Sequence, residues 1–332
     1  MDLVESQRTN QWANRRVLVT GATGMIGSGV VRKLLDLNAD VVCFILDATP
    51  QSELIRSGDI NRTSVVNGDL KDFWAVERAV NEYEVDTIIH LGAQTIVGTA
   101  HRFPLPTLET NIRGTYNVLE AARLHSDLVC RLVVASSDKA YGEQAELPYT
   151  EDTPLGATFP YDVSKACADL VAQMYYTSFE LPVAIARCGN VYGEGDLNWS
   201  RIVPGTIRAL LNRESPVIRS DGNYVRDYIY LGDVVNAYLE LADVSGDSGV
   251  SGQSFNFSNE TPVTVLQMVE EVASVLRVSD IAPTILDETH GEIHSQYLSS
   301  AKARRVLGWT ANFSLRQGLE ATTRWYRQLL GL

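Results

Sequence analysis

The 332-residue sequence has little of what metal centres, disulfide frameworks and membrane spans require. Its four cysteines, Cys43, Cys130, Cys167 and Cys188, lie in apolar or helical settings without paired spacing, which favours reduced thiols. No apolar run reaches the length of a bilayer, and the N-terminal residues are polar and acidic without an apolar signal core. We therefore expect a soluble, cytoplasmic protein with no metal site.

Positive charge is also scarce. The sequence has 28 Lys and Arg against 41 Asp and Glu, so its net charge of -13 disfavours nucleic acids and acidic membrane surfaces as partners. A phosphate-bearing ligand therefore needs local arginines and backbone amides. The hydrophobic content of 45% is enough to bury a large core in a chain of this length, and we expect two lobes. The residues before Asn14 are expected to form a loose arm.

A glycine-rich turn follows the first apolar run. Residues 16–20 are rich in β-branched side chains and predict a buried strand, and residues 25–37 have the apolar stripe of a helix. Glycines between such a strand and helix let the backbone approach a pyrophosphate, whose charge is met by amides at the helix N-terminus. The alternative is a tight turn without a ligand. We expect cofactor contacts from Gly21, Thr23, Gly24, Met25, Ile26 and Gly27.

An acidic residue ends the second predicted strand. Residues 40–46 lead to Asp47, twenty residues after Gly27. A carboxylate at this position can accept hydrogen bonds from both ribose hydroxyls and repels a 2′-phosphate, so it favours NAD over NADP. The alternative is that Asp47 caps the following loop. The next two strand ends add Asp69, Leu70, Leu91, Ala93 and Gln94 as expected cofactor contacts.

Strand and helix patterns alternate as far as residue 187. Alternation of this kind predicts an α/β fold of the Rossmann type, a doubly wound parallel sheet with its ligand at the carboxyl ends of the strands. The later pattern is less regular and predicts a smaller α/β substrate-binding lobe. We expect residues 1–188 and 225–258 to form the NAD-binding domain, and residues 189–224 and 259–332 to form the lobe. The predicted strands lie at residues 63–66, 87–91, 131–135, 183–187, 216–219, 225–229 and 254–257, and the helices at residues 72–83, 105–124, 202–211, 233–241 and 315–329.

A tyrosine and a lysine share one face of a further predicted helix. Tyr161 and Lys165 are four residues apart, so both side chains can act on one substrate group. An ammonium near a phenol stabilises the phenolate and lowers its pKa, which makes the tyrosine a usable base. This spacing also occurs by chance, and the alternative is a surface helix with a solvated lysine.

The glycine turn and the Tyr161/Lys165 pair together resemble those of extended short-chain dehydrogenase/reductases that act on nucleotide sugars. The resemblance covers nearly the whole chain and implies NAD as the cofactor, a nucleotide diphosphate sugar as the substrate, and a homodimer formed through the long helices. Residues 135–142 match the loop that carries the catalytic serine of the family, which places that role on Ser137. The alternative for Ser137 is a strand-end cap.

Within this family the sequence is most similar to sugar 4,6-dehydratases, above all to the cytidine diphosphate glucose branch. Residues 46–48, 137–139, 189–204 and 292–302 carry this similarity. It implies that Asp138 acts as an acid and Lys139 as a base in a water elimination. The alternative for Lys139 is a pair with Asp138 or with a substrate phosphate.

The resemblance also implies a set of substrate contacts. We expect Ser137, Asn190, Arg201, Arg219, Arg226 and His294 to bind the substrate. A forked guanidinium suits a diphosphate, although Arg219 and Arg226 have the alternative of surface charges and Asn190 that of a turn former. The roles of Glu292 and His294 stay open.

Two other functions compete with the dehydratase. A carbon 4 epimerase would use the same oxidation and return the hydride to the opposite face of the sugar. A dinucleotide-sensing protein on the same fold would need the glycine turn but would have no use for Ser137, Tyr161 and Lys165.

Overall fold

Seven parallel strands form the centre of the molecule. The computed structural model describes residues 11–288 and 292–332. Residues 1–10 of the expected N-terminal arm lie outside the described residues. The strand order is β11-β6-β5-β4-β1-β2-β3, and every neighbouring pair is parallel. This order confirms the predicted doubly wound α/β sheet. The strands are β1 (Arg16–Thr20), β2 (Asp40–Ile45), β3 (Ser64–Asn67), β4 (Thr87–His90), β5 (Arg131–Ala135), β6 (Val183–Cys188) and β11 (Ser254–Phe257).

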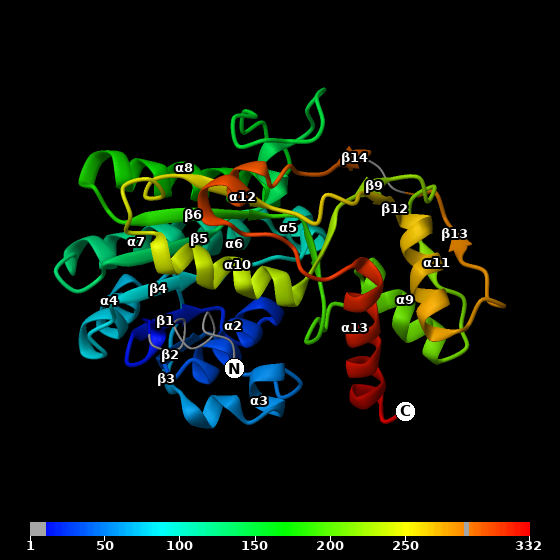
Figure 1. Ribbon diagram of the computed structural model, residues 1–332, viewed down its shortest axis with the longest axis horizontal. Helices are drawn as coiled ribbons and strands as arrows, with labels where there is room; N and C mark the ends of the chain where they lie inside the picture. The colour runs from blue at the N-terminus through cyan, green and yellow to red at the C-terminus, as the bar shows by residue number, and fades with distance from the viewer. Residues whose placement is uncertain (1–10, 289–291) are drawn as a thin grey trace.

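Both faces of the sheet are buried, which explains the near-continuous apolar runs of its strands. Successive side chains of a strand point to opposite faces, so Val17 and Val19 join one core while Leu18 joins the other. Helices α2 (Met25–Asp36) and α10 (Leu231–Val244) cover the first face. Helices α4 (Phe73–Glu82), α7 (Gly114–Leu124) and α8 (Pro160–Phe179) cover the second (Figure 1).

Short elements connect this framework. The single helix predicted at residues 105–124 is instead α6, the π-helical turn η2 and α7 in direct succession, so the pattern located the helix but not its interruption. The strand predicted at residues 225–229 is split into β9 and β10 at Asp227, which is fully buried. The connecting elements are α3 (Glu53–Arg56), η1 (Asp59–Arg62), α5 (Val97–Arg102), α6 (Pro104–Leu108), η2 (Glu109–Arg113), η3 (Asp138–Tyr141), β7 (Asn190–Tyr192), β9 (Val225–Arg226) and β10 (Tyr228–Tyr230).

A smaller group of helices and short strands lies beside the sheet, at the right of Figure 1. Its helices pack on one another, and its strands form one three-stranded sheet, β12-β9-β14, and one pair, β13-β8. Its elements are α9 (Ile202–Leu211), β8 (Val217–Ile218), β12 (Val263–Thr264), α11 (Val265–Leu276), β13 (Thr284–Ile285), β14 (Ser295–Gln296) and α13 (Leu315–Leu330).

The expected domain division stays a prediction. Two segments pack against elements of the other expected domain. Strand β9 falls in the expected NAD-binding domain but pairs with β12 and β14. Helix α12 (Ala301–Leu307) falls in the expected lobe but packs against β11 of the central sheet. At the N-terminus, Trp12 is buried in the core, with the guanidinium of Arg15 over its ring, so this part of the expected arm is packed.

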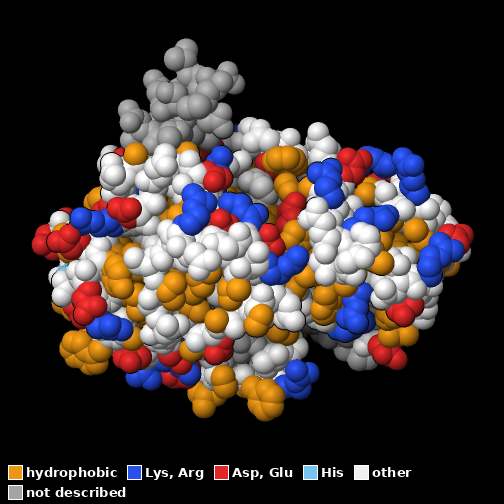
Figure 2. Space-filling model, turned by 90° about the horizontal axis from the view of Figure 1, so that it is seen from below, with side chains coloured by type: hydrophobic (Ala, Val, Ile, Leu, Met, Phe, Trp, Pro, Cys, Tyr) orange, Lys and Arg blue, Asp and Glu red, His pale blue; other side chains and the backbone are white. Residues whose placement is uncertain are grey.

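The surface of the described chain carries both signs of charge. Lys and Arg side chains are interspersed with Asp and Glu over the face seen in Figure 2. None of the helices in residues 11–288 and 292–332 is long and apolar enough to cross a bilayer. Within the same residues, no group of three or more His, Cys, Asp or Glu is arranged to hold a metal ion.

Candidate active site

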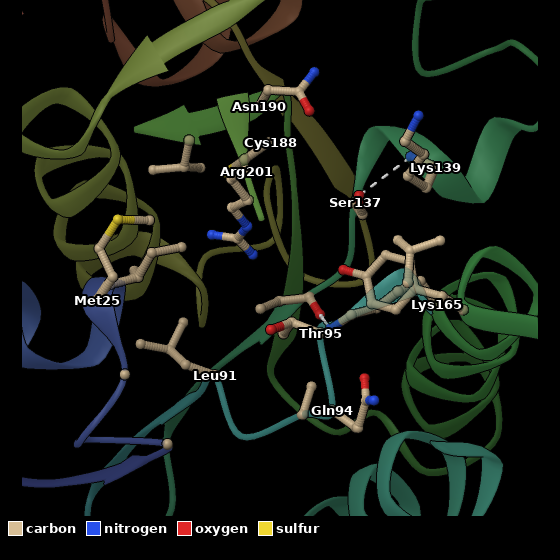
Figure 3. Close-up of a pocket in the computed structure, with 18 of the residues that line it drawn as sticks. Met25, Leu91, Gln94, Thr95, Ser137, Lys139, Lys165, Cys188, Asn190 and Arg201 are labelled. Atoms are coloured by element: carbon tan, nitrogen blue, oxygen red, sulfur yellow. Dashed lines mark hydrogen bonds between the residues drawn. The ribbon is translucent and has the colours of Figure 1, made fainter. Parts of the chain in front are cut away.

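A cavity of about 850 Å³ lies at the carboxyl ends of the central strands. Its walls come from both parts of the molecule: the glycine turn, the strand ends and the start of α8 on one side, and residues of the smaller group on the other. Figure 3 shows Met25 and Leu91 on the side of the glycine turn and Ser137, Lys139 and Asn190 further along the cavity. The topology places all these side chains together because the carboxyl ends of parallel strands share one edge.

The glycine turn is closely packed against the sheet. Gly21 has a φ of +67°, and a Cβ on it would lie 2.8 Å from Gly92. A Cβ on Gly27 would lie 2.2 Å from the carbonyl oxygen of Gly21. Helix α2 begins after Gly24 without a side-chain cap and with no acidic residue in its first turn. Its free amides therefore face the cavity with a partial positive charge, and this fits the diphosphate of a dinucleotide.

The structure brings all the other expected cofactor residues to the same cavity. Asp47 is exposed just beyond β2, and Asp69 follows β3 with Lys71 3.1 Å from its carboxylate. Gln94 is tied to η2 because its backbone amide donates to Oδ1 of Asn111 at 2.8 Å. The expected residues that line the cavity are Gly21, Thr23, Gly24, Met25, Ile26, Gly27, Asp47, Asp69, Leu70, Leu91, Ala93, Gln94, Tyr161 and Lys165.

Ser137, Tyr161 and Lys165 line one wall. Pro160 opens α8, so Tyr161 lies in its first turn and Lys165 one turn further on the same face. The ammonium of Lys165 donates to the carbonyl oxygen of Ala135 at 2.8 Å, and burial lowers its pKa to about 8. Burial raises the pKa of Tyr161 to about 12, while Arg201 and a side-chain hydrogen bond with Ser137 act in the opposite direction. In this state the positive charge that favours the phenolate comes mainly from Arg201.

Ser137 is both a cap and a cavity residue. Its Oγ accepts a hydrogen bond from the backbone amide of Lys139 at 3.2 Å and so caps η3 (Figure 3). The same hydroxyl donates to Oδ1 of Asp138 at 2.9 Å. Oδ2 of Asp138 is buried and has no hydrogen-bond partner among the residues that the structure describes. The capping function that was the alternative for Ser137 is therefore present together with its place at the cavity.

Lys139 is held by a residue from a distant part of the chain. Its ammonium donates to Oε1 of Gln296 at 2.6 Å, and Nε2 of Gln296 donates in turn to the carbonyl oxygen of Asp138 at 2.9 Å. Burial lowers the pKa of Lys139, Arg226 adds to this effect, and Asp138 opposes it. A buried lysine with a lowered pKa suits a base, which needs a free amine.

A second buried carboxylate lies close to this lysine. Asp162 follows Tyr161 in α8, lines the cavity and is only 5% exposed. Burial raises its pKa to about 6, Lys139 lowers it and Asp138 raises it further. The sequence alone did not indicate a role for Asp162. Its position directly after the expected catalytic tyrosine was the only local signal, and the charges that surround it come from other elements.

Three of the expected substrate residues line the far part of the cavity. Nδ2 of Asn190 is buried without a hydrogen-bond partner in the described structure, and this leaves an amide free for a ligand. Arg201 forms an ion pair with Asp196 at 3.1 Å and keeps part of its guanidinium exposed. Arg226 is buried, and its guanidinium donates to the carbonyl oxygens of residues 225, 293 and 294.

Two expected substrate residues do not line this cavity. Arg219 is exposed just after β8. His294 is also exposed, and its ring packs on that of Tyr224 with centroids 5.0 Å apart. Tyr224 and Glu292 line the cavity in their place. Glu292 lies in the matched stretch 292–302 and Tyr224 directly precedes the predicted strand at residues 225–229, but the sequence pattern could not show which of these side chains face the cavity.

The sheet order, the glycine turn and the Ser137, Tyr161 and Lys165 set together define an extended short-chain dehydrogenase/reductase, a class whose members hold a dinucleotide beside a catalytic tyrosine. A model of the family described as GDP-mannose 4,6 dehydratase matches residues 18–322. The chain belongs to this family, and this confirms the resemblance to sugar 4,6-dehydratases that its sequence indicated.

Known relatives include both dehydratases and epimerases. CDP-glucose 4,6-dehydratase of Salmonella typhimurium is 30% identical over 96% of this chain and 92% of its own length. The structure of dTDP-glucose 4,6-dehydratase from Streptomyces venezuelae, with NAD bound, has a TM-score of 0.86 at 28% identity and covers 95% of this chain and 98% of its own. The structure of UDP-glucose 4-epimerase from Thermotoga maritima, with UDP-glucose, has the same TM-score at 27% identity and covers 95% and 99%.

Proposed function

We propose that this protein is an NAD-dependent nucleotide-sugar 4,6-dehydratase that converts a nucleoside diphosphate hexose into its 4-keto-6-deoxy derivative. The observation that carries this proposal is the placement of an acid and a base directly after the catalytic serine. Asp138 and Lys139 share the cavity wall with Ser137, Tyr161 and Lys165. The relatives that bind NAD and act as 4,6-dehydratases support the same conclusion.

The first half of the proposed reaction is an oxidation at carbon 4. The glycine turn and Asp47 would hold NAD, which would supply hydride acceptance at carbon 4 and hydride return at carbon 6, so that no net redox change would result. Tyr161 takes the proton of the carbon 4 hydroxyl, and Ser137 holds that hydroxyl. Lys165 orients the ribose of the cofactor, and Arg201 favours the phenolate by its charge.

The second half is an elimination of water. The new ketone at carbon 4 acidifies the proton on carbon 5, because the resulting negative charge is delocalised into the carbonyl. Lys139 takes this proton as a free amine, for which its lowered pKa is suited. Asp138 gives a proton to the leaving hydroxyl of carbon 6, so that water departs, and Lys139 returns its proton to carbon 5.

Basic and amide side chains bind the nucleotide diphosphate in this proposal. Asn190 and Arg226 contact the phosphates, and Arg201 lies nearest the sugar because its charge acts on Tyr161. These cations suit an acidic protein that binds an anionic substrate, since they place positive charge where the phosphates lie.

The main competing function is a carbon 4 epimerase, which the epimerase relatives favour. Incubation of the purified protein with cytidine, thymidine, guanosine and uridine diphosphate glucose separates the two. A dehydratase yields a 4-keto-6-deoxy sugar that absorbs in the near ultraviolet in alkali, and mass spectrometry shows the loss of one water. An isomer of unchanged mass would instead establish the epimerase and reject the elimination.

We also propose that the protein is a cytoplasmic homodimer. Apolar side chains are exposed on neighbouring helices, with Leu105 of α6 67% exposed, Leu124 of α7 50% and Leu170 of α8 54%. The continuous succession of α6, η2 and α7 packs beside α8, so a second copy would bury this face as a contact of two long helices from each copy. Light scattering after gel filtration tests the dimer, and Leu170→Glu should yield monomers. The free cysteines suit a reducing compartment.

A further inference from the structure

The nitrogen of Lys139 touches a neutral side chain rather than a carboxylate. Among residues 11–288 and 292–332, its one hydrogen-bond partner is Oε1 of Gln296, at 2.6 Å. The carboxylates of Asp138 and Asp162 act on this lysine through their charge alone. Gln296 is 0% exposed and does not line the cavity. It can therefore influence a bound substrate only through the residues that it holds.

The backbone of Asp138 decides which end of the Gln296 amide faces the lysine. Nε2 of Gln296 donates to the carbonyl oxygen of Asp138 at 2.9 Å. A carbonyl oxygen only accepts, so a reversed amide would set two acceptors against each other and lose this hydrogen bond. Oε1, which also only accepts, must therefore face Lys139. A free amine has two N–H groups and one lone pair, and Gln296 in this orientation uses an N–H group and never the lone pair.

The strand that carries Gln296 is fixed on both sides. Strand β14 pairs with β9, and Gln296 lies opposite Arg226 in this pairing. Just before the strand, the guanidinium of Arg226 donates to the carbonyl oxygens of residues 293 and 294 at 2.6 and 3.0 Å. Just after it, the backbone amide of Tyr149 donates to the carbonyl oxygen of Tyr297 at 3.0 Å. The Gln296 amide is thus a firm support for the turn η3, which carries the proposed acid and base.

From this geometry, and on the basis of the proposed function, we infer that Gln296 positions Lys139 as the base of the elimination, because its neutral oxygen fixes the nitrogen and leaves the lone pair free for the carbon 5 proton. The nitrogen forms an N–H bond with that proton, and the electron pair of the carbon 5–hydrogen bond becomes the carbon 5–carbon 6 double bond. The carbon 6 hydroxyl leaves as water with a proton from Asp138. The amide oxygen accepts from the amine and from the ammonium alike, so Lys139 keeps its place throughout.

The missing charge on Gln296 is the property to test. Burial lowers the pKa of Lys139, Arg226 acts in the same direction, and three nearby carboxylates oppose them. These carboxylates belong to Asp138, Asp162 and Glu292. A fourth carboxylate at position 296 would touch the nitrogen and raise the pKa of Lys139 further. Activity that needs the free amine declines as pH falls through this pKa, so the acid limb of the kcat profile should move about one to three pH units higher.

The experiment compares Gln296→Glu and Gln296→Met with the wild type. The substrate is whichever nucleoside diphosphate glucose the wild type dehydrates, with cytidine diphosphate glucose tried first, and the alkaline absorbance follows the product. We expect Gln296→Glu to move the acid limb to higher pH. Gln296→Met removes both hydrogen bonds and adds no charge, so it should lower the kcat plateau about tenfold or more, through loss of orientation, without raising the limb. KM should change little in both variants, since Gln296 does not line the cavity.

Absorbance at 340 nm locates the affected step. The oxidation at carbon 4 uses Tyr161 and not Lys139, so we expect enzyme-bound reduced cofactor to accumulate in both variants during turnover. A matched control is Gln253→Glu. Nε2 of Gln253 also donates to a carbonyl oxygen, that of Gly249 at 2.8 Å, but this side chain does not line the cavity and does not contact η3. The control makes the same change of charge and should keep the wild-type pH profile.

Several results would contradict the role of Gln296 while the dehydratase stands. These are an unmoved acid limb in Gln296→Glu, a limb that rises equally in both variants, or a wild-type kcat in Gln296→Met. Thermal unfolding shows whether each variant is folded; if only one of them folds, that variant decides, and loss of folding in both would make Gln296 a purely structural residue and overturn the inference. A wild type that forms no 4-keto-6-deoxy product would reject the proposed function and this inference together.

Discussion

A buried ion pair holds together three of the elements that carry the site, and its removal should be costly. Asp169 of α8 accepts two hydrogen bonds from the guanidinium of Arg187 in β6, at 2.8 and 2.9 Å. Arg187 also donates to the hydroxyl of Tyr141 in η3 at 2.8 Å. The Arg187 and Asp169 side chains are 3% and 0% exposed. The pair therefore fixes α8, which carries Tyr161, relative to the loop that carries Ser137.

The substitution Asp169→Asn keeps the size of this side chain and removes its charge. Arg187 is then left buried without a counter-charge, and such a loss destabilises proteins by about 3–5 kcal/mol. At about 2 °C per kcal/mol for a large domain, this corresponds to a fall of about 6–10 °C in Tm. Arg187 cannot lose its charge by deprotonation at ordinary pH. The free-energy cost of the buried, unpaired charge therefore has to appear as unfolding or as movement of the three elements.

Thermal unfolding followed by circular dichroism measures this effect. The matched control is Asp280→Asn, which breaks a two-bond contact with Arg213 at the surface, where both side chains are more than 60% exposed. Exposed pairs contribute about 0–1 kcal/mol, so the control should melt within about 2 °C of the wild type. Equal Tm values for Asp169→Asn and Asp280→Asn would refute the argument that burial makes the pair costly to break. We also expect kcat of the folded Asp169→Asn enzyme to fall more than its KM changes.

Three further substitutions test other parts of the site. Asp162→Asn removes a negative charge that raises the pKa of Lys139. If Lys139 acts as a free amine, activity declines as pH falls through the pKa of Lys139, so the variant should move this acid limb of the kcat profile to lower pH. An unmoved limb would reject the amine as the base. Gly27→Ala places a methyl group 2.2 Å from the carbonyl oxygen of Gly21, so titration calorimetry should show loss of most NAD binding, and unchanged affinity would contradict the close turn. Asp47→Ser removes the expected acceptor for the ribose hydroxyls, so it should weaken NAD binding about tenfold and reduce the preference for NAD over NADP. An unchanged ratio of the NAD and NADP affinities would mean that Asp47 only caps its loop.

Local sequence patterns located most elements of the fold. The strands at residues 16–20, 131–135 and 254–257 and the helix at residues 202–211 agree with the structure at both ends. These segments have a strong apolar periodicity and are bounded by turn residues, so their conformation follows from short-range preferences. The break at Asp227 and the π-helical turn at residues 109–113 were not predicted, because neither contains a glycine or proline and both depend on neighbours in space.

The residues of the candidate site likewise fall into those that the sequence located and those that only the tertiary structure placed. The glycine turn and the residues at strand ends were found because a parallel sheet brings its strand ends to one edge whatever the loops contain. Asp162 and Gln296 were missed, since each acquires its place from elements that are distant in the sequence. Arg219 was expected at the cavity and is exposed instead, because no local pattern fixes the direction of a side chain after the two-residue strand β8.

The sequence by itself determined that a strand, a glycine turn and a helix would open the chain, and that a tyrosine and a lysine would share one helical face. These features depend on backbone preferences that act over a few residues. Only the tertiary structure decided that Gln296, 157 residues away, would hold Lys139, and that Arg187 would lie against Asp169. Contacts of this kind depend on how the whole core packs, because they join side chains whose separation along the chain carries no information about their distance in space.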